Sequence, residues 1–355
     1  MVRGWAEHPG ARHHGAHGDV ISRSLHIPVG DLLDFSQNIN PLGPPPEVLE
    51  AAKRALYEES AHYPDLGYTE LCDALAGYLG VSVEHVVPTN GGAEALFLAA
   101  GEAGGGGALV LEPTFSEYAA AARASGMKVV RRVARRPEEG FAFDHAALDD
   151  LRGISVVFLC NPNNPTGDAL GSREVLKVAE RVREAGAVLL VDEAFTDFVP
   201  EISVAGMVDG GLWVARSLTK FFAIPGLRLG CLLCDDAERV QRLQPSWPVN
   251  AVAEAAGIAA ARDGSFAGAS VTEVARLRGD LFRALEGLDG LRPFPGAANF
   301  LLVRGPEGLP WRLARRGVLV RGCGPFMGLG EEYFRVAVRG EAENGRLISA
   351  LREEL

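Results

Sequence analysis

Short apolar runs alternate with helical segments through the middle of the 355-residue chain. Nearly unbroken apolar runs are typical of strands in a parallel sheet that helices cover on both faces. The runs lie at 108–112, 154–160, 187–192 and 212–215. Their regular alternation with helices predicts an α/β fold whose large domain is a mostly parallel, doubly wound sheet.

Helical spacing of apolar residues flanks this region. Helices are predicted at 47–59, 68–79, 93–100 and 249–261, and a strand at 85–88 that the tight turn 89–92 joins to the next helix. From residue 271, a long helix precedes strands near 298–303, 318–321 and 333–338 and a last helix from Glu341. This order predicts a smaller α+β domain at 271–355, a large domain at 51–270, and an N-terminal arm at 1–50 that forms part of the small domain.

The charge and composition of the chain limit the classes of molecule that it is expected to bind. The formal net charge of −11 argues against nucleic acid. No apolar run reaches the roughly 20 residues that span a bilayer, and the first ten residues lack the apolar stretch of a secretory signal. We therefore expect a cytoplasmic protein with no membrane partner. A basic run at 131–136 predicts a solvated strand edge and loop.

Five cysteines spread through the chain predict reduced thiols rather than a disulfide framework. Cys231 and Cys234 lie three residues apart in one apolar run, so on a strand their side chains would point to opposite faces. We interpret both as core residues, with a metal or redox role as the alternative. The histidines near the N-terminus have no Cys or acidic partner at ligand spacing, and no metal site is predicted.

Candidate chemistry gathers where the run 212–215 ends. Ser217, Thr219 and Lys220 follow that run, and Arg228 comes eight residues after the lysine. A lysine whose pKa is lowered by its surroundings can form a Schiff base with an aldehyde. Hydroxyls and a guanidinium can bind a phosphate on the same molecule. The combination indicates pyridoxal phosphate, and the alternative is a surface lysine with a helix-terminal arginine.

Other strand ends carry residues that suit the same cofactor. Asp192 ends a buried strand, where a carboxylate needs a cation such as a protonated pyridine nitrogen, unless it caps a helix. Asn164 can donate a hydrogen bond to a phenolate oxygen of the cofactor, or it can be part of a turn that has only a structural role. Phe115 can stack on a ring or belong to the core, and Tyr63 can reach a phosphate across a dimer interface or be a turn residue. Arg335 lies in an apolar strand, where a buried guanidinium needs a carboxylate partner.

The order of these candidates along the chain resembles the fold-type I pyridoxal phosphate enzymes of the class I and II aminotransferase family, over nearly the whole length. The resemblance implies the fold of those enzymes and a homodimer. It makes Lys220 the Schiff-base lysine, Asp192 the partner of the pyridine nitrogen and Asn164 the partner of the ring hydroxyl. The implied phosphate contacts are the backbone N–H groups of Gly92 and Ala93, the side chains of Ser217, Thr219 and Arg228, and Tyr63 of a neighbouring subunit.

A narrower resemblance is to the threonine-phosphate decarboxylases of cobalamin biosynthesis, which are similar to histidinol-phosphate aminotransferases. It rests on the phrases LDFS (33–36), NINPLG (38–43), DEAF (192–195), RSLTKF (216–221), AIPGLRLG (223–230) and FRVAVR (334–339). The wider family usually has Tyr three residues after the aspartate, where this chain has Phe195. Phe is expected at this position in the narrower subgroup, and the change removes a hydroxyl from the ring oxygen. The implied reaction is decarboxylation of O-phospho-L-threonine to (R)-1-amino-2-propanol phosphate.

The resemblance also implies the substrate contacts. Arg335 is expected to hold the α-carboxylate, helped by Arg339 or Asn38. The subgroup has a His-Gly-Gly segment that folds towards the substrate, and His17-Gly18 occupies that place, followed here by Asp19. Two alternatives stay open: a class I and II aminotransferase that acts on histidinol phosphate or a similar donor, and a regulator that binds the cofactor without catalysis.

Overall fold

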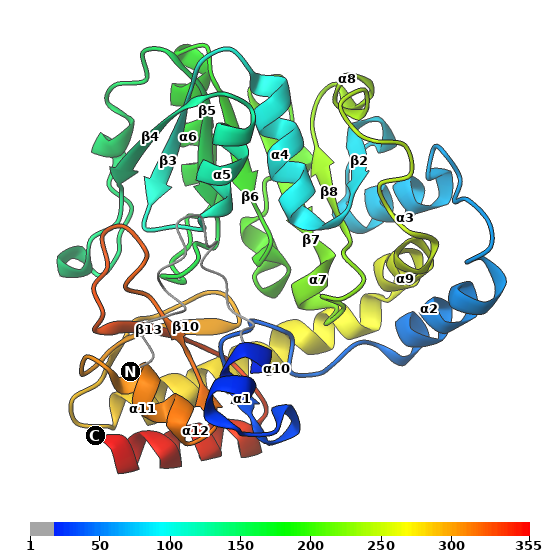
Figure 1. Ribbon diagram of the computed structural model, residues 1–355. Helices are drawn as coiled ribbons and strands as arrows, with labels where there is room; N and C mark the ends of the chain where they lie inside the picture. The colour runs from blue at the N-terminus through cyan, green and yellow to red at the C-terminus, as the bar shows by residue number, and fades with distance from the viewer. Residues whose placement is uncertain (1–17) are drawn as a thin grey trace.

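The computed structural model describes residues 18–355. Its largest feature is a seven-stranded sheet with the order β2-β8-β7-β6-β5-β3-β4 (Figure 1). β3 to β7 run parallel, and β8 is antiparallel to both β2 and β7. The strands are β2 (Val86–Thr89), β3 (Gly107–Glu112), β4 (Lys128–Val133), β5 (Ile154–Cys160), β6 (Val188–Asp192), β7 (Leu212–Ser217) and β8 (Gly230–Leu233). The predicted mostly parallel α/β fold is confirmed.

Helices cover both faces of this sheet. One face packs against α4 (Gly91–Ala103), α5 (Glu117–Ala124) and α8 (Ala237–Gln241), and the other against α3 (Thr69–Leu79), α6 (Ser172–Glu184) and α9 (Ala251–Arg262), with α2 (Pro46–Glu58) packed on α9. Cys231 and Cys234 fall in different cores, one on each face, and all five cysteines are buried and free. The interpretation of this pair as core residues on opposite faces is confirmed.

The remaining strands form two small sheets below the large one (Figure 1). An antiparallel sheet has the order β12-β13-β10-β9, and a parallel pair joins β1 to β11. The strands are β1 (Leu33–Asp34), β9 (Arg292–Pro293), β10 (Phe300–Arg304), β11 (Val318–Leu319), β12 (Arg321–Gly322) and β13 (Tyr333–Ala337). The predicted strand 318–321 is therefore divided, because its two halves pair with different sheets. The helices here are α1 (Gly18–Leu25), α11 (Leu309–Arg315) and α12 (Glu341–Glu354).

One long helix, α10 (Gly264–Glu286), connects the two parts of the molecule. Its first half packs on the core of the large sheet through Phe266 and Val271, and its second half lies in the smaller core with Leu277 and Leu285. The domain boundary predicted at residue 271 falls inside this helix. Among residues 18–355, neither α10 nor any other helix is long and apolar enough to cross a membrane.

The basic run 131–136 includes the last three residues of the edge strand β4 and the residues after it. The run lies at a strand edge, as predicted, but not all of its side chains are exposed to solvent. Arg135 is fully buried: its Nε donates to Asp168 at 2.7 Å, and its guanidinium carbon lies 5.1 Å from the ring centre of Phe143. The reason is that the chain turns back after residue 136, so that Arg135 and Phe143 form a β-bridge. The prediction of a solvated loop is wrong for this residue.

Candidate active site

Three neighbouring strands end at the same edge of the large sheet and bring the predicted cofactor residues together. Asp192 ends β6 and Ser217 ends β7, while Asn164 lies in the turn that follows β5. The strand register sets Asp192 beside Cys160 on one side and Ala215 on the other. Ligands of such sheets bind beyond the carboxyl ends of the strands, and this edge faces the β10–β13 sheet (Figure 1).

Asp192 is a buried carboxylate, 8% exposed, held by two hydrogen bonds. The Tyr118 hydroxyl donates to its Oδ2 at 2.7 Å, and the Ala194 N–H donates to its Oδ1 at 2.9 Å. Burial raises the pKa of Asp192, and these two hydrogen bonds act in the opposite direction. Within residues 18–355 no lysine or arginine forms an ion pair with it, so a protonated ring nitrogen fits this place.

Sequence reasoning missed Tyr118. Its ring stacks on Phe158 at 5.4 Å and meets Phe115 edge to face at 5.8 Å. The available signal was the spacing of three residues between Phe115 and Tyr118, which puts two aromatic side chains near each other at the start of a helix.

Lys220 lies in α7 (Leu218–Phe221), the single helical turn that follows β7. Its backbone carbonyl accepts a hydrogen bond from the Asn40 N–H at 3.0 Å. Burial, and after it the charges of Arg335 and Arg228, lower the pKa of Lys220 to about 8. More of the amine is therefore unprotonated near neutral pH than in an ordinary lysine, and the unprotonated form is the one that attacks an aldehyde.

A close approach of backbone segments builds an anion cradle beside Lys220. Gly91 begins α4 with φ +76°, and a Cβ there would lie 2.7 Å from an Arg228 nitrogen. A Cβ on Gly92 would lie 3.1 Å from the Cβ of Ser217, whose hydroxyl is 2.8 Å from that of Thr219. The free N–H groups at the start of α4, which include Ala93, thus meet two hydroxyls and a guanidinium. These are the donors that a phosphate requires.

Arg335, on β13, is 6% exposed and has no carboxylate of its own among residues 18–355. It donates to the Asn164 Oδ1 and, at 2.8 Å, to the Ser36 carbonyl, and its guanidinium carbon lies 5.3 Å from the ring centre of Phe300. Its buried Nε has no hydrogen-bond partner. Burial lowers the pKa of Arg335 to about 10. The expected carboxylate partner is thus absent from this range, because the neighbouring loops supply neutral carbonyl groups.

A second arginine, which sequence reasoning missed, lies directly opposite Arg335. Arg321 on β12 is its cross-strand partner, and its guanidinium carbon lies 5.7 Å from the ring centre of Phe326. Burial lowers the pKa of Arg321 as well. Like charges directly opposite one another on adjacent strands repel, and the charge of Arg321 adds to burial in lowering the pKa of Arg335. Arg321 could have been identified from the sequence, because the predicted strand 318–321 ends on this arginine.

Two of the other predicted substrate residues lie near this ribbon. Asn38 is buried, with an Oδ1 that has no hydrogen-bond partner in the described part of the chain. It lies between Ser36, which contacts Arg335, and Asn40, which contacts Lys220. The charge of Arg339, in contrast, already has a partner within the protein, because its guanidinium forms an ion pair with Glu343 at 2.6 Å.

The predicted N-terminal contact is placed only in part. Gly18 begins α1, and a Cβ on it would lie 4.0 Å from the Asp34 side chain. His17 lies outside the described residues.

Three predicted aromatic contacts lie in different surroundings. Phe115 is half-buried beside Tyr118, and Phe195 is buried with its ring edge to face on Phe300 at 5.0 Å. Tyr63 is 79% exposed and stacks on Trp247 at 4.4 Å. Its loop between α2 and α3 lies at the outer side of the molecule, away from α7 (Figure 1). Within one chain the structure does not bring Tyr63 to the other candidates.

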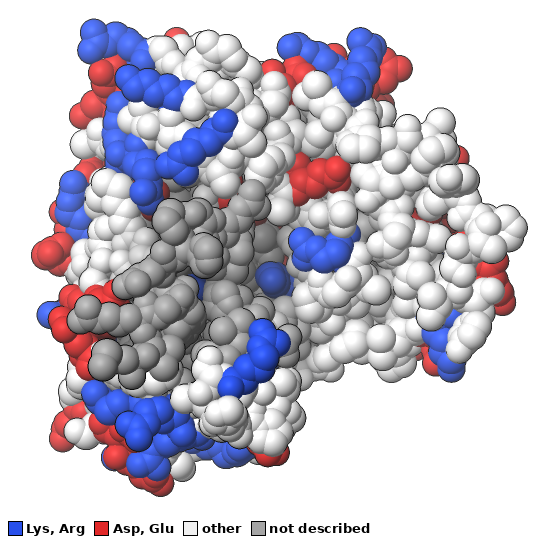
Figure 2. Space-filling model, viewed as in Figure 1, with Lys and Arg blue, Asp and Glu red and all other residues white. Residues whose placement is uncertain are grey.

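The charges of the site suit an aldehyde cofactor with a phosphate and an anionic substrate. On the face seen in Figure 2, Lys and Arg side chains lie on both the upper and the lower part of the molecule. The buried carboxylate, the partly deprotonated lysine and the phosphate cradle match the ring nitrogen, aldehyde and phosphate of pyridoxal phosphate. No cluster of three or more His, Cys, Asp or Glu side chains in the range 18–355 is arranged to hold a metal ion.

Comparison with known proteins gives concordant results. The family model for aminotransferase class I and II matches residues 30–351. Threonine-phosphate decarboxylase of Salmonella typhimurium is 39% identical, over 96% of this chain and 96% of that protein. Histidinol-phosphate aminotransferase of Methanopyrus kandleri is 31% identical, over 96% of this chain and 93% of that protein. The solved histidinol-phosphate aminotransferase from Clostridium acetobutylicum superposes with a TM-score of 0.85 at 28% identity, over 91% of this chain and 98% of that chain.

Proposed function

The chain belongs to the aminotransferase class I and II family, and within it we propose that the protein is a pyridoxal phosphate-dependent decarboxylase of O-phospho-L-threonine. The product is (R)-1-amino-2-propanol phosphate, for cobalamin biosynthesis. The observation that carries this proposal is the pair of cross-strand arginines, Arg335, whose charge acts on Lys220, and Arg321 directly opposite it. This substrate joins one amine to two anionic groups, a carboxylate and a phosphate. The 39% identity to a threonine-phosphate decarboxylase supports the same substrate.

In this proposal each part of the site has one task toward the cofactor, whose protonated ring, when bound, withdraws electrons from the substrate Cα. Asp192 keeps the ring nitrogen protonated. The start of α4, with Ser217, Thr219 and Arg228, binds the phosphate. Phe115 and Phe195 line the ring. Lys220, with its lowered pKa, would hold the aldehyde group.

Asn164 links the cofactor to the substrate. Its Oδ1 accepts a hydrogen bond from Arg335, and because arginine can only donate, the amide oxygen must face Arg335. The Nδ2 group of Asn164 is then the donor available to the ring oxygen. A substrate carboxylate bound by Arg335 is in this way fixed relative to the cofactor ring.

Arg335 and Lys220 together determine which bond at Cα is broken. In our proposal Arg335, with Asn38, would orient the α-carboxylate, and Arg321 would hold the substrate phosphate. Lys220, in its ammonium form, would give Cα the proton that replaces the carbon dioxide that has left.

Substrate comparison is the decisive experiment. The purified protein, loaded with pyridoxal phosphate, should release carbon dioxide from O-phospho-L-threonine with no 2-oxo acid present. Turnover that requires 2-oxoglutarate, with histidinol phosphate as the donor, would instead identify an aminotransferase. Cofactor binding without turnover of either compound would favour a non-catalytic role. Lys220→Ala should lose the absorbance of the bound cofactor near the edge of the visible range, and an unchanged spectrum would contradict the role given to this lysine.

We also propose a homodimer in which Tyr63 of one chain completes the phosphate cradle of the other. Exposed apolar side chains near that loop support it, because large exposed apolar groups mark interaction surfaces. They are Leu49, Leu56, Tyr57, Tyr63, Leu66 and Trp247. Sedimentation equilibrium tests the dimer, and a Tyr63→Phe variant that binds pyridoxal phosphate as tightly as the wild type would contradict the shared cradle. The buried, unpaired cysteines support a cytoplasmic location.

A further inference from the structure

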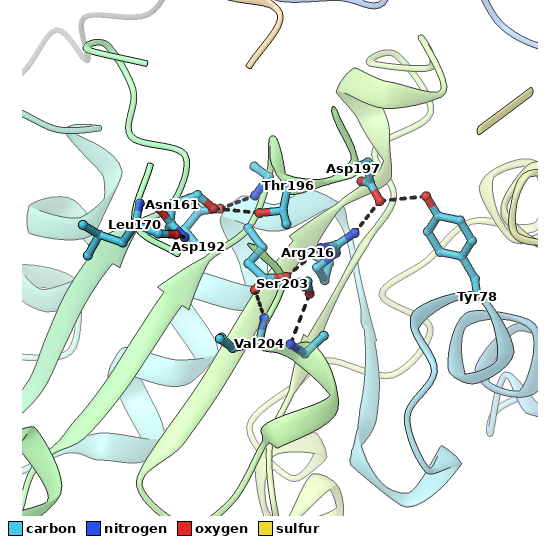
Figure 3. Close-up of polar contacts among 12 residues, drawn as sticks. Tyr78, Asn161, Leu170, Asp192, Thr196, Asp197, Ser203, Val204 and Arg216 are labelled. Atoms are coloured by element: carbon cyan, nitrogen blue, oxygen red, sulfur yellow. Dashed lines mark hydrogen bonds and ion pairs between the residues drawn. The ribbon is translucent and has the colours of Figure 1, made fainter. Parts of the chain in front are cut away.

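A buried ionic network lies behind the active site, centred on Arg216. Arg216 is 4% exposed, and its two terminal nitrogens reach two carboxylates: Glu193 at 2.7 Å, and Asp197. Figure 3 shows Arg216 between Ser203 and Asp197, with Tyr78 on the far side of Asp197. The network therefore contains one positive and two negative side chains, all within the core of the large domain.

Each carboxylate also accepts hydrogen bonds from other segments of the chain. Glu193 accepts from the Ser203 hydroxyl and from the Val204 N–H, both at 2.7 Å. Asp197 accepts from the Tyr78 hydroxyl of α3, also at 2.7 Å. Arg216 is thereby connected to the loop after β6 and to a helix on the same face of the sheet.

Strand geometry places this network directly behind the cofactor residues. Successive side chains of a strand point to opposite faces, and Arg216 is the neighbour of Ser217, while Glu193 follows Asp192. Asp192 contacts Tyr118 and Ser217 contacts Gly92 on one face. Arg216 and Glu193 meet on the other face, and the Glu193 N–H donates to the Ala215 carbonyl at 2.9 Å between the strands.

We propose that Arg216 is a positioning residue for the cofactor site: through Glu193 and Asp197 it fixes the ends of β6 and β7 relative to each other. The separation between Asp192, which holds the cofactor ring, and the Ser217–Lys220 segment, which holds its phosphate and aldehyde, is set by this connection. The inference rests on the proposed function, since it concerns the geometry of the same cofactor.

The composition of the network argues for this role rather than for simple packing. Ion pairs in a core add little stability compared with well-packed apolar residues, because desolvation offsets their attraction. Their directional hydrogen bonds do restrict the relative positions of the segments that they join. Glu193 raises the pKa of Asp192 and Arg216 lowers it, so the two members of the network act on that carboxylate in opposite directions.

The test measures cofactor binding rather than turnover, in three variants. Arg216→Met removes the centre of the network but leaves two buried carboxylates, so it can fail to fold. The triple variant Arg216→Met, Glu193→Gln, Asp197→Asn removes the connection without stranding a charge. Val178→Ala, a buried position on α6, is the control for general loss of stability, and its melting temperature without cofactor is compared with that of the triple variant.

Equilibrium dialysis of the cofactor-free proteins gives the dissociation constant of pyridoxal phosphate. Misplacement by about 1 Å can reduce function by roughly a hundredfold, so we expect the triple variant to bind roughly 10- to 100-fold more weakly, while Val178→Ala binds as the wild type does. The 15N shift of ring-labelled pyridoxal phosphate should show less ring-nitrogen protonation in the triple variant alone. A triple variant with wild-type affinity and a wild-type shift would overturn the positioning role. A wild-type protein that does not bind pyridoxal phosphate would defeat the proposed function itself.

Discussion

Arg216 and Arg335 are both almost completely buried, but they are surrounded in opposite ways. Arg216 lies behind the large sheet with two carboxylates, and although burial acts to lower its pKa, Asp197 and Glu193 raise it. Arg335 lies on the small antiparallel sheet with carbonyl groups and a ring, and burial lowers its pKa to about 10. The fold supplies two carboxylates to the first guanidinium, whereas the second has none within residues 18–355. In our proposal, this difference separates an arginine that organises the site from one that binds the substrate.

The largest effect that tests this comparison is on stability. Arg216→Met should lower the free energy of unfolding by about 3–5 kcal/mol, because it leaves Glu193 and Asp197 buried without a cation. Urea denaturation of the cofactor-free protein measures it. The triple neutral variant serves as the control and should recover most of the loss. A change below about 1 kcal/mol in Arg216→Met would mean that the two carboxylates find other partners.

Arg335→Met should show the opposite pattern, with activity lost and stability kept. Removing the group that holds a substrate carboxylate should reduce kcat/KM for carbon dioxide release by roughly 10²- to 10³-fold. The unfolding free energy should change by no more than about 1 kcal/mol, because no carboxylate of the protein is stranded. Steady-state kinetics and urea denaturation of the same preparation give both numbers. A stability loss as large as that of Arg216→Met would remove the distinction between the two arginines.

Asp192 extends the comparison to a buried carboxylate, which in our proposal binds a cationic ligand. Tyr118→Phe deletes one of its two hydrogen bonds, and a hydrogen bond to a charged group contributes about 1.5–3 kcal/mol. We expect pyridoxal phosphate to bind roughly tenfold more weakly or worse, as measured by equilibrium dialysis. Tyr333→Phe offers a matched control, since that tyrosine is buried in the smaller sheet. Equal affinity in Tyr118→Phe and wild type would show that the Ala194 N–H alone holds the carboxylate.

The smallest expected effect is on the pH dependence of cofactor capture. The Lys220 amine reacts as the free base, so the rate of pyridoxal phosphate capture should rise with pH and level off above a midpoint at about 8. Burial is the main cause of this low pKa, and the charge of Arg335 adds to it. Arg335→Met should therefore raise the midpoint by a fraction of a pH unit, while Arg339→Met, whose charge is paired with Glu343, should leave it unchanged. Stopped-flow absorbance measures the rates, and a wild-type midpoint near 10 would contradict the effect of burial.

Residues at strand ends could be predicted from the sequence, whereas the contacts that distant residues make with them could not. Asp192, Ser217 and Lys220 follow apolar runs directly, so the strand pattern alone locates them at one edge of a parallel sheet. Tyr118 reaches Asp192 from 74 positions away in the chain, and Arg335 reaches Asn164 from 171. No local pattern encodes these distances, because they arise only when separate elements pack.

Boundaries were missed where a local contact overrides the apolar pattern. The helix predicted to begin after residue 271 begins at Gly264, because the Asp263 side chain accepts the Phe266 N–H at 3.0 Å and caps it. Arg135 was expected in solvent, but the bridge to Phe143 folds the following loop over it. In both places the deciding interaction involves a polar group, to which hydrophobic periodicity is insensitive.

Gly230 determines how far the sequence around the phosphate cradle can vary. A Cβ at this position would lie 2.6 Å from the Arg216 carbonyl oxygen, 2.7 Å from the Gly91 carbonyl carbon and 2.7 Å from the Gly92 nitrogen. All three are backbone atoms, so no exchange of a neighbouring side chain can make room for even an alanine. The cradle residues Ser217 and Thr219 have chemically similar substitutes, but Gly230 has none. In evolution this position, which contributes no reactive group, is therefore expected to be among the least free to change.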